Sequence, residues 1–140
     1  MSKMIEINGD LFSSNTNLAH CVSSDFVMGA GIAKSFKEKY GSVQKLKMQN
    51  KDVGECAFLE HDNKKIYYLV TKRNFYDKPT YNSMKQSLVS MKKLIKEHQV
   101  QEIAIPLIGC GLDRLNWNKV KQIILDVFCN TNLKIFVYKK

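Results

Sequence analysis

Segments with the pattern of β-strands alternate with segments with the pattern of α-helices along most of this chain, and this limits the fold more than any other feature. The strand-like segments are 4–8, 18–22, 55–60, 65–71, 102–108 and 133–138. Apolar residues recur every three or four positions, as in amphipathic helices, in 32–40, 42–49, 80–99 and 116–128. The alternation predicts an α/β fold in which helices cover both faces of a sheet.

The length of 140 residues fits one domain, so residues 1–140 are expected to form a single unit. A hydrophobic content of 44% and a charged content of 25% are typical of globular proteins. No apolar run approaches the ~18 residues that a membrane span needs. The first ten residues also lack the apolar core of a signal peptide. We therefore expect an intracellular protein, cytoplasmic or nuclear, with no membrane partner and no sign of assembly beyond a monomer.

The cysteines and histidines show no spacing that is typical of a metal site or a redox motif. They are Cys21, Cys56, Cys110, Cys129, His20, His61 and His98. We expect no structural metal, and we expect the cysteines to be buried free thiols in a reducing compartment. His20 is expected to be a buried, hydrogen-bonded strand residue. Cys110 has no histidine near it in sequence to activate it as a nucleophile.

The net charge is strongly positive, since 22 Lys and Arg against 13 Asp and Glu give +9. A basic protein favours anionic partners such as phosphates, nucleotides or nucleic acid. The alternative is a lysine-rich surface that is simply solvated. The charge therefore permits a phosphate-bearing ligand, or non-specific nucleic-acid binding, without requiring either.

Two glycine-containing segments each join a predicted strand region to a predicted helix. They are Met28-Gly-Ala-Gly-Ile-Ala33 and Pro106-Leu-Ile-Gly-Cys-Gly-Leu-Asp113. Glycines let the backbone approach a ligand closely, and the N-terminus of a helix offers free N–H groups to a phosphate. The first segment lacks the third glycine of a dinucleotide fingerprint, because Lys34 stands there, and a tight structural turn explains it equally well. Together, the two segments predict a groove for a pyrophosphate at the carboxyl end of the sheet.

Asp10 follows the first predicted strand directly, after Gly9. A carboxylate at a strand end can accept a hydrogen bond from an exocyclic amine such as that of adenine. The more common role of such an Asp is to form a turn or to cap a helix.

Six motifs in this order resemble the macrodomain family, and specifically its terminal ADP-ribose protein glycohydrolase branch. They are the segments 7–12, 18–23, 28–33, 67–72, 78–81 and 108–115. The resemblance runs from about residue 4 to residue 140. Gly-Cys-Gly-Leu-Asp-Arg-Leu at 109–115, together with Val-Thr-Lys at 70–72, is specific to that branch. Leu107 departs from the pattern, because a relative can carry a basic residue there.

The resemblance implies a three-layer α/β/α domain with a mixed, mostly parallel sheet that binds ADP-ribose without a cofactor. It implies hydrolysis of mono-ADP-ribose esters on Glu and Asp side chains of proteins, and of O-acyl-ADP-ribose. Lys72 would be the nucleophile and Asp113 the general acid/base. The ligand-binding residues that it implies are Asp10, Leu11, Ser23, Gly29, Ala30, Gly31, Ile32, Ala33, Leu107, Ile108, Gly109, Cys110, Gly111, Leu112 and Lys140.

The residues themselves permit this chemistry but leave alternatives open. A neutral lysine amine can attack the anomeric carbon of a ribose ester, provided that burial or a cationic neighbour such as Arg73 favours its deprotonation. Lys72 could equally be a solvated residue at a strand end, and Asp113 could serve the following helix or pair with Arg114. The alternative functions are a hydrolase of ADP-ribosylated nucleic acid bases, a non-catalytic ADP-ribose reader and an RNA-binding protein.

Overall fold

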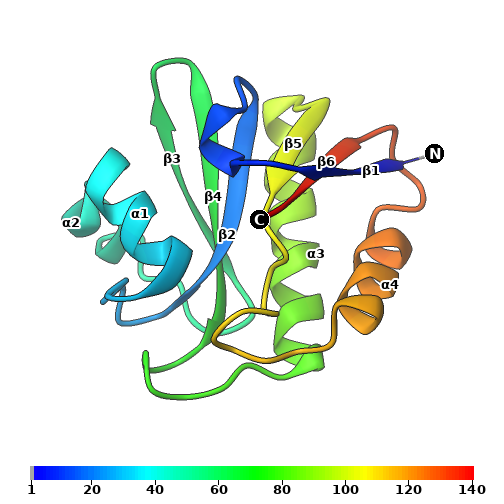
Figure 1. The fold of residues 1–140 in the computed structure, drawn as a ribbon. Coiled ribbons are helices and arrows are strands. Elements are labelled where there is room, and N and C mark those ends of the chain that lie inside the picture. Colours follow the sequence, from blue (N-terminus) through cyan, green and yellow to red (C-terminus); the bar gives the residue numbers. More distant parts are fainter. Residues whose placement is uncertain (1) are drawn as a thin grey trace.

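A computed structural model describes residues 2–140, and within them six strands alternate with four α-helices and one 3-10 helix (Figure 1). In chain order these are β1 (Lys3–Asn8), η1 (Leu11–Ser13), β2 (Asn17–Ser23), α1 (Gly31–Tyr40), α2 (Val43–Lys47), β3 (Cys56–His61), β4 (Lys64–Lys72), α3 (Tyr81–His98), β5 (Glu102–Ile105), α4 (Trp117–Val127) and β6 (Lys134–Lys139). The predicted α/β alternation is confirmed.

The strands form one sheet in the order β1-β6-β5-β2-β4-β3. β3 and β4 are antiparallel, and every other neighbouring pair is parallel, so the sheet is mixed and mostly parallel as expected. The antiparallel pair closes at Asp62 and Asn63, which both have positive φ angles, of 48° and 66°. Two such residues suit a tight hairpin turn, and Asn and Asp tolerate this conformation better than most side chains.

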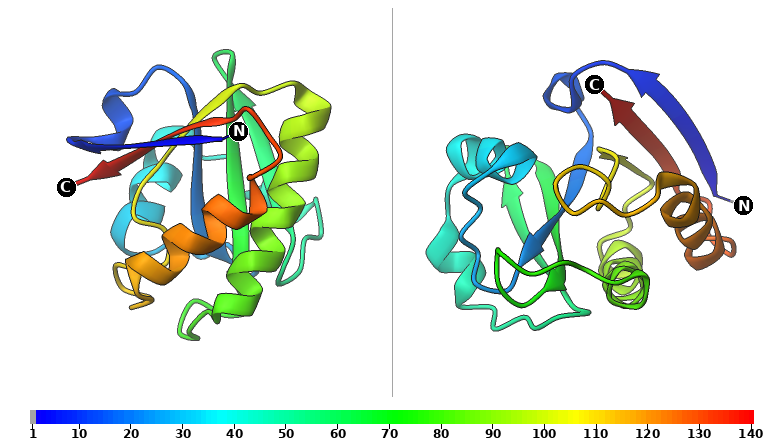
Figure 2. Two further views of the ribbon diagram at one scale, coloured as in Figure 1. Left: turned by 90° about the vertical axis from the view of Figure 1, so that its right-hand side faces the viewer. Right: turned by 60° about the horizontal axis from the view of Figure 1, so that its bottom comes forward.

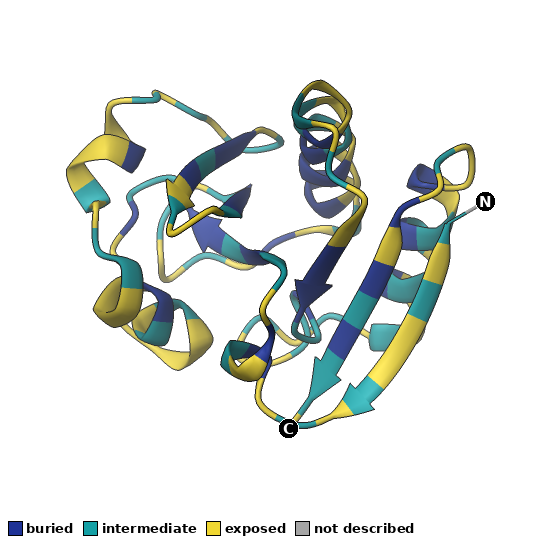
Figure 3. Cartoon of the chain, turned by 90° about the horizontal axis from the view of Figure 1, so that it is seen from above, coloured by how far each residue is buried: buried dark blue, intermediate teal, exposed yellow. Residues whose placement is uncertain are grey.

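The two faces of the sheet are covered by different helices (Figures 1 and 2). Side chains alternate between the faces of a strand, and in β4 Tyr67 and Leu69 pack with α3 and α4. Tyr68 and Val70 point to the opposite face, where α1 and α2 lie. The central strands are therefore buried on both sides, whereas β1 at the edge is largely exposed (Figure 3).

The helix starts follow the sequence signals. The Thr80 side chain accepts a hydrogen bond from the Ser83 amide, and Ser83 returns one to the Thr80 backbone, so α3 begins with a capping box. Asn116 caps α4 through the Lys119 amide. These caps fix where α3 and α4 begin beside the carboxyl edge of the sheet.

Three expectations need correction. The predicted strand 102–108 ends at Ile105, because Pro106 has no N–H to continue the ladder and the chain turns into a loop. His20 is fully buried, but neither ring nitrogen has a hydrogen-bond partner among the described residues. Its ring instead stacks on that of Phe36, with 3.7 Å between the centroids. All four cysteines are free thiols, but only Cys56 is buried: Cys21 and Cys110 are half-buried, and Cys129, which follows the end of α4, is exposed.

Candidate active site

Five parallel strands end at one edge of the sheet, and the residues that follow or end them line a single cavity of about 990 Å³. Asp10 follows β1, Ser23 ends β2 and Lys72 ends β4, while the 106–113 loop follows β5 and Lys140 follows β6. Ligands of α/β proteins bind at this edge, and the volume suits a nucleotide-sized ligand.

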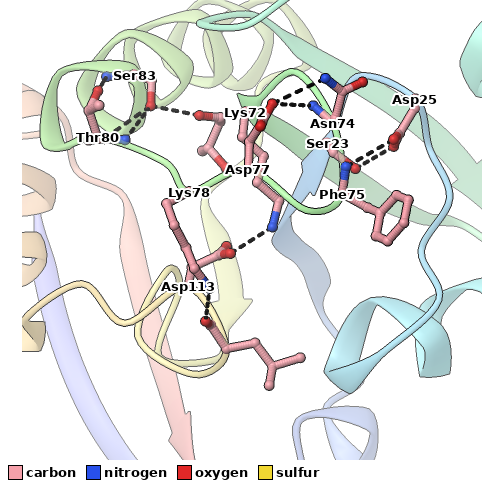
Figure 4. Close-up of polar contacts among 12 residues, drawn as sticks. Ser23, Asp25, Lys72, Asn74, Phe75, Asp77, Lys78, Thr80, Ser83 and Asp113 are labelled. Carbon is pink, nitrogen blue, oxygen red and sulfur yellow. Dashed lines mark hydrogen bonds and ion pairs between the residues drawn. The ribbon is translucent and has the colours of Figure 1, made fainter.

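An ion pair lies in this cavity, where Lys72 Nζ is 2.7 Å from Asp113 Oδ1 (Figure 4). The side chains are only 14% and 16% exposed. The two residues are 41 positions apart in the chain and meet because the carboxyl ends of β4 and β5 share one edge. Lys72 is therefore not a solvated strand-end lysine, and Asp113 pairs with Lys72 rather than with Arg114.

The loop that carries Asp113 depends on Gly109, whose φ is +71°. A Cβ at this position would lie 2.7 Å from Cε of Met84 on α3 and 3.0 Å from Cδ1 of Leu115. The Leu115 amide donates to the Gly109 carbonyl at 2.7 Å, which closes the loop. A Cβ at Gly111 would meet nothing within 4 Å. Only the first of these two glycines is required by packing.

Asp25, which the sequence did not mark as a site residue, connects the loops beside Lys72. Its carboxylate accepts hydrogen bonds from the Ser23 hydroxyl and from the Phe75 amide at 2.9 Å (Figure 4). It also accepts one from the Val27 amide at 3.2 Å. Partial burial opposes ionisation, but these hydrogen bonds and the nearby Lys72 charge hold the pKa of Asp25 below its usual value.

The loop between β4 and α3 is tied to both sides of the cavity. The Ser24 hydroxyl donates to the Arg73 carbonyl at 2.7 Å, and Lys78 Nζ donates to the Leu112 carbonyl at 2.8 Å. Within the loop, the backbone amide and the side-chain amide of Asn74 donate to Asp77. The loop therefore bridges the segment after β2 and the segment after β5, on either side of Lys72.

The far end of the cavity is built from Asp10, Leu11, Phe12, Tyr138 and Lys140. Asp10 Oδ1 accepts a hydrogen bond from the Phe12 amide at 3.0 Å, so Asp10 caps the short helix η1. Its capping role is clear, and its predicted contact with adenine stays a prediction.

Comparisons with known proteins agree with this architecture. The family model described as "Macro domain" matches residues 19–124. The human protein named ADP-ribose glycohydrolase OARD1 is 47% identical over 139 residues, which cover 98% of this chain and 91% of that protein. The chain belongs to the macrodomain family. The macrodomain of Thermus aquaticus DarG, 22% identical, superposes with a TM-score of 0.89 over the full length of both chains. A Mycobacterium tuberculosis protein named DNA ADP-ribosyl glycohydrolase is 28% identical over 138 residues, which cover 86% of this chain but 37% of that protein.

All of the residues predicted for the ligand site line the cavity of this macrodomain. Their roles remain predictions, because the structure gives their positions alone. The prediction missed several lining residues: Phe12, Cys21, Val27, Met28, Ser35, Lys39, Phe75, Lys78 and Tyr138. Ser35 and Lys39 lie one helical turn apart on α1, so the spacing of the two residues indicates that they share one face of that helix. Lys78 lies in the family motif 78–81 but was not assigned to the site, and for Phe75 no local pattern in the sequence exists.

The two cavity cysteines are held as thiols. Burial raises the pKa of Cys110 to about 11 and raises that of Cys21 further. Neither is therefore a thiolate nucleophile near neutral pH. Within residues 2–140, no three His, Cys, Asp or Glu side chains gather as metal ligands would. Among the same residues no helix is both long enough and apolar enough to cross a membrane.

Proposed function

We propose that this macrodomain is a hydrolase that removes mono-ADP-ribose from ester linkages to Glu and Asp side chains, and that it deacylates O-acyl-ADP-ribose. The observation that carries the proposal is the 2.7 Å contact between Lys72 and Asp113 inside the cavity. A reader that only binds ADP-ribose needs the cavity but has no need for an amine and a carboxylate in contact there. The human relative's name, ADP-ribose glycohydrolase, supports a hydrolase of ADP-ribose linkages.

The cavity offers a place for each part of ADP-ribose. Helix α1 begins after Ala30 with no side-chain cap, so amides of its first turn are available to a phosphate. Asp10, Leu11 and Lys140 lie at the end that would receive the adenosine. With the pyrophosphate beside α1, the distal ribose would lie at the opposite end, next to Lys72 and Asp113. ADP-ribose and mono-ADP-ribosylated proteins are thus the proposed partners, and no cofactor is needed.

The contact between the two side chains defines the first step of the reaction. Asp113 accepts a proton from the Lys72 ammonium, and the free amine attacks the anomeric carbon of the distal ribose. The bond from that carbon to the ester oxygen breaks, and the departing oxygen takes the bonding electrons and the proton held by Asp113, so the carrier leaves as a carboxylic acid and Asp113 is again a carboxylate. Water, deprotonated by Asp113, then adds to the same carbon of the lysine adduct. The carbon–nitrogen bond breaks, and the amine takes back a proton from Asp113.

Two substitutions of Lys72 test this mechanism. Lys72→Ala removes the amine, whereas Lys72→Arg keeps a cation beside Asp113 that cannot lose its proton near neutral pH. Both should lower turnover of a glutamyl-ADP-ribose ester at least about a thousandfold. Calorimetry should still detect ADP-ribose binding in both variants. Lys121→Ala is the matched control, because Lys121 forms a more exposed ion pair with Glu6 away from the cavity. Unchanged turnover in Lys72→Ala would refute the lysine mechanism.

A trapping experiment tests the covalent step directly. The closed-ring Lys72 adduct becomes an imine when the bond from the anomeric carbon to the ring oxygen breaks and the ring oxygen takes the proton of the amine. Cyanoborohydride reduces this imine to a stable secondary amine. Intact-protein mass spectrometry should then show one added ADP-ribose in the wild-type chain and none in Lys72→Arg. Peptide mapping that places the label on another lysine would contradict the proposed nucleophile.

A second candidate is hydrolysis of ADP-ribose from nucleic acid bases. The net charge of +9 favours it, as do the exposed Arg73 and Arg114, which flank the ion pair in sequence. The Mycobacterium tuberculosis relative's name also points to DNA. Release of ADP-ribose from a modified protein and from a modified oligonucleotide should be compared at equal substrate concentration. Faster release from the oligonucleotide would favour this second function.

A further inference from the structure

Exposed apolar side chains concentrate around the mouth of the cavity. Eight large hydrophobic residues are exposed among those that the structure describes, and four of the eight line the cavity: Val27, Ile32, Phe75 and Leu112. We call these four the apolar rim. Scattered exposed hydrophobics are ordinary in soluble proteins, but a cluster beside a binding cavity is typical of a surface that another molecule covers.

Phe75 is the largest member of the apolar rim, and its backbone is held in place by polar contacts. Its side chain is 56% exposed although it lines the cavity. The Phe75 amide donates to Asp25, and the neighbouring Asn74 is bonded to Asp77. In Figure 4 the ring lies on the Asp25 side of the loop, away from α3. The structure thus fixes the backbone of an aromatic residue whose ring has an open face.

The position of the apolar rim relative to Lys72 suggests what covers it. Phe75 lies in the loop after Lys72, and Leu112 directly precedes Asp113, whose carboxylate contacts Lys72. The Leu112 side chain extends from there toward Gly31 at the start of α1, so the apolar rim borders the region that would hold the distal ribose. The group that leaves this region is the carrier of ADP-ribose and not the nucleotide. The carrier must therefore pass the apolar rim.

We propose that Phe75, held by Asp25, contacts the peptide next to an ADP-ribosylated Glu or Asp and selects substrates with an apolar residue there. This inference rests on the proposed function. A peptide fits the apolar rim better than a nucleic acid does, because Val27, Ile32 and Leu112 are aliphatic and offer no flat surface for base stacking. The exposed Arg73 and Arg114 nearby in sequence also suit an acidic peptide.

Two synthetic peptides test the selection. Each carries ADP-ribose on one glutamate, followed by Leu in the first peptide and by Ser in the second. Affinities are measured in the Lys72→Ala background, in which the ester should survive, and are divided by the affinity of each variant for free ADP-ribose. The Leu peptide should bind about tenfold more tightly than the Ser peptide, a difference equivalent to ~1.4 kcal/mol.

Replacement of the ring should abolish this preference. Phe75→Ala in the same background should bring the ratio of the two affinities close to one. Met48→Ala is the matched control, because Met48 is a large apolar residue that is 77% exposed and is absent from the cavity lining. Tyr76 does not serve, because its ring packs edge-on against that of Phe75 at 5.3 Å between centroids. The ratio should be retained in Met48→Ala. A ratio of one before the substitution, or a ratio that Phe75→Ala leaves intact, would overturn the proposal.

The positioning role of Asp25 has its own test. Asp25→Ala should lower the Leu-to-Ser ratio toward one, as Phe75→Ala does, because it removes the acceptor of the Phe75 amide. A ratio that stays near tenfold in Asp25→Ala would show that Asp25 does not act through Phe75. If Asp25→Ala does not fold, Asp25→Asn serves instead, since its amide nitrogen cannot accept a hydrogen bond.

The failures of the two proposals can be told apart. If the wild-type chain hydrolyses no ADP-ribose ester, the proposed function fails, while the ratio of peptide affinities can still be measured. If hydrolysis occurs but the ratio is one, only the role of Phe75 fails. An ADP-ribosylated oligonucleotide is the third probe. Weaker binding of that probe by Phe75→Ala, with a peptide ratio of one, would mean that Phe75 stacks on bases and would overturn peptide selection.

Discussion

His20 and Lys72 lie on neighbouring strands, but their surroundings differ. His20, in the middle of the sheet, has aromatic neighbours around its ring, whereas Lys72, at the carboxyl end, has a charged partner. His20, in the middle of β2, has no hydrogen-bond partner among the described residues and packs between the rings of Phe36 and Tyr68. Burial lowers the pKa of His20 to about 3, so it is neutral and serves as an aromatic ring. Lys72, at the end of β4, contacts the carboxylate of Asp113.

The difference shows where this fold can support chemistry. Helices cover the middle of the sheet on both faces, so the His20 ring loses water there and finds no hydrogen-bond partner among the described residues. At the carboxyl end, loops from several strands surround a cavity and can supply partners such as Asp113 and Asp25. A charged side chain is retained only where the loops provide a counter-charge.

The largest expected effect comes from breaking the pair at the carboxyl end. Asp113→Asn keeps the shape of the side chain but cannot take the proton of Lys72. We expect turnover of a glutamyl-ADP-ribose ester to fall between about a hundredfold and ten-thousandfold, the range for loss of a general acid/base. Rates under saturating substrate, with ADP-ribose affinity measured in parallel, would show this. A loss confined to affinity would mean that Asp113 binds substrate and transfers no proton.

A smaller effect, on stability alone, is expected from the middle of the sheet. Below pH 6.5 the unfolded chain binds a proton at His20 that the folded chain does not bind until about pH 3. Stability therefore falls as pH decreases through this window, and His20 should account for about 2 kcal/mol between pH 7 and pH 5. Urea unfolding at both pH values measures the change in the wild-type chain and in His20→Phe. His61→Gln, at a more exposed histidine, is the control.

Loss of this pH dependence in His20→Phe, with its retention in His61→Gln, would support the assignment to His20. Equal pH dependence in the wild-type chain and in His20→Phe would contradict it. Other titrating groups are shared by the variants, so the comparison isolates the one ring.

Much of the fold could be predicted from the sequence, because periodic apolar residues decide which segments form strands and helices. The meeting of Lys72 and Asp113 was expected from the family motifs, and the parallel sheet explains it. By contrast, Asp25 binds the amide of Phe75, which lies 50 residues later, and no local pattern reports such a contact. The unpartnered state of His20 likewise depends on what α1 places over it.

The two glycines of the 106–113 loop look equivalent in sequence, but their conformation and surroundings differ, and we expect the smallest effects from their substitution. Gly109 has a φ of +71°, and a Cβ there would lie 2.7 Å from Cε of Met84, whereas a Cβ at Gly111 would meet nothing within 4 Å. Gly109→Ala should therefore lower the free energy of unfolding by about 1 to 2 kcal/mol, the usual cost of a left-handed conformation for a residue with a Cβ. Gly111→Ala should change it by less than about 0.5 kcal/mol, as for an exposed position. Chemical denaturation of both variants decides the matter. Equal destabilisation would mean that the positive φ of Gly109 and the close approach of Met84 do not distinguish this glycine from Gly111.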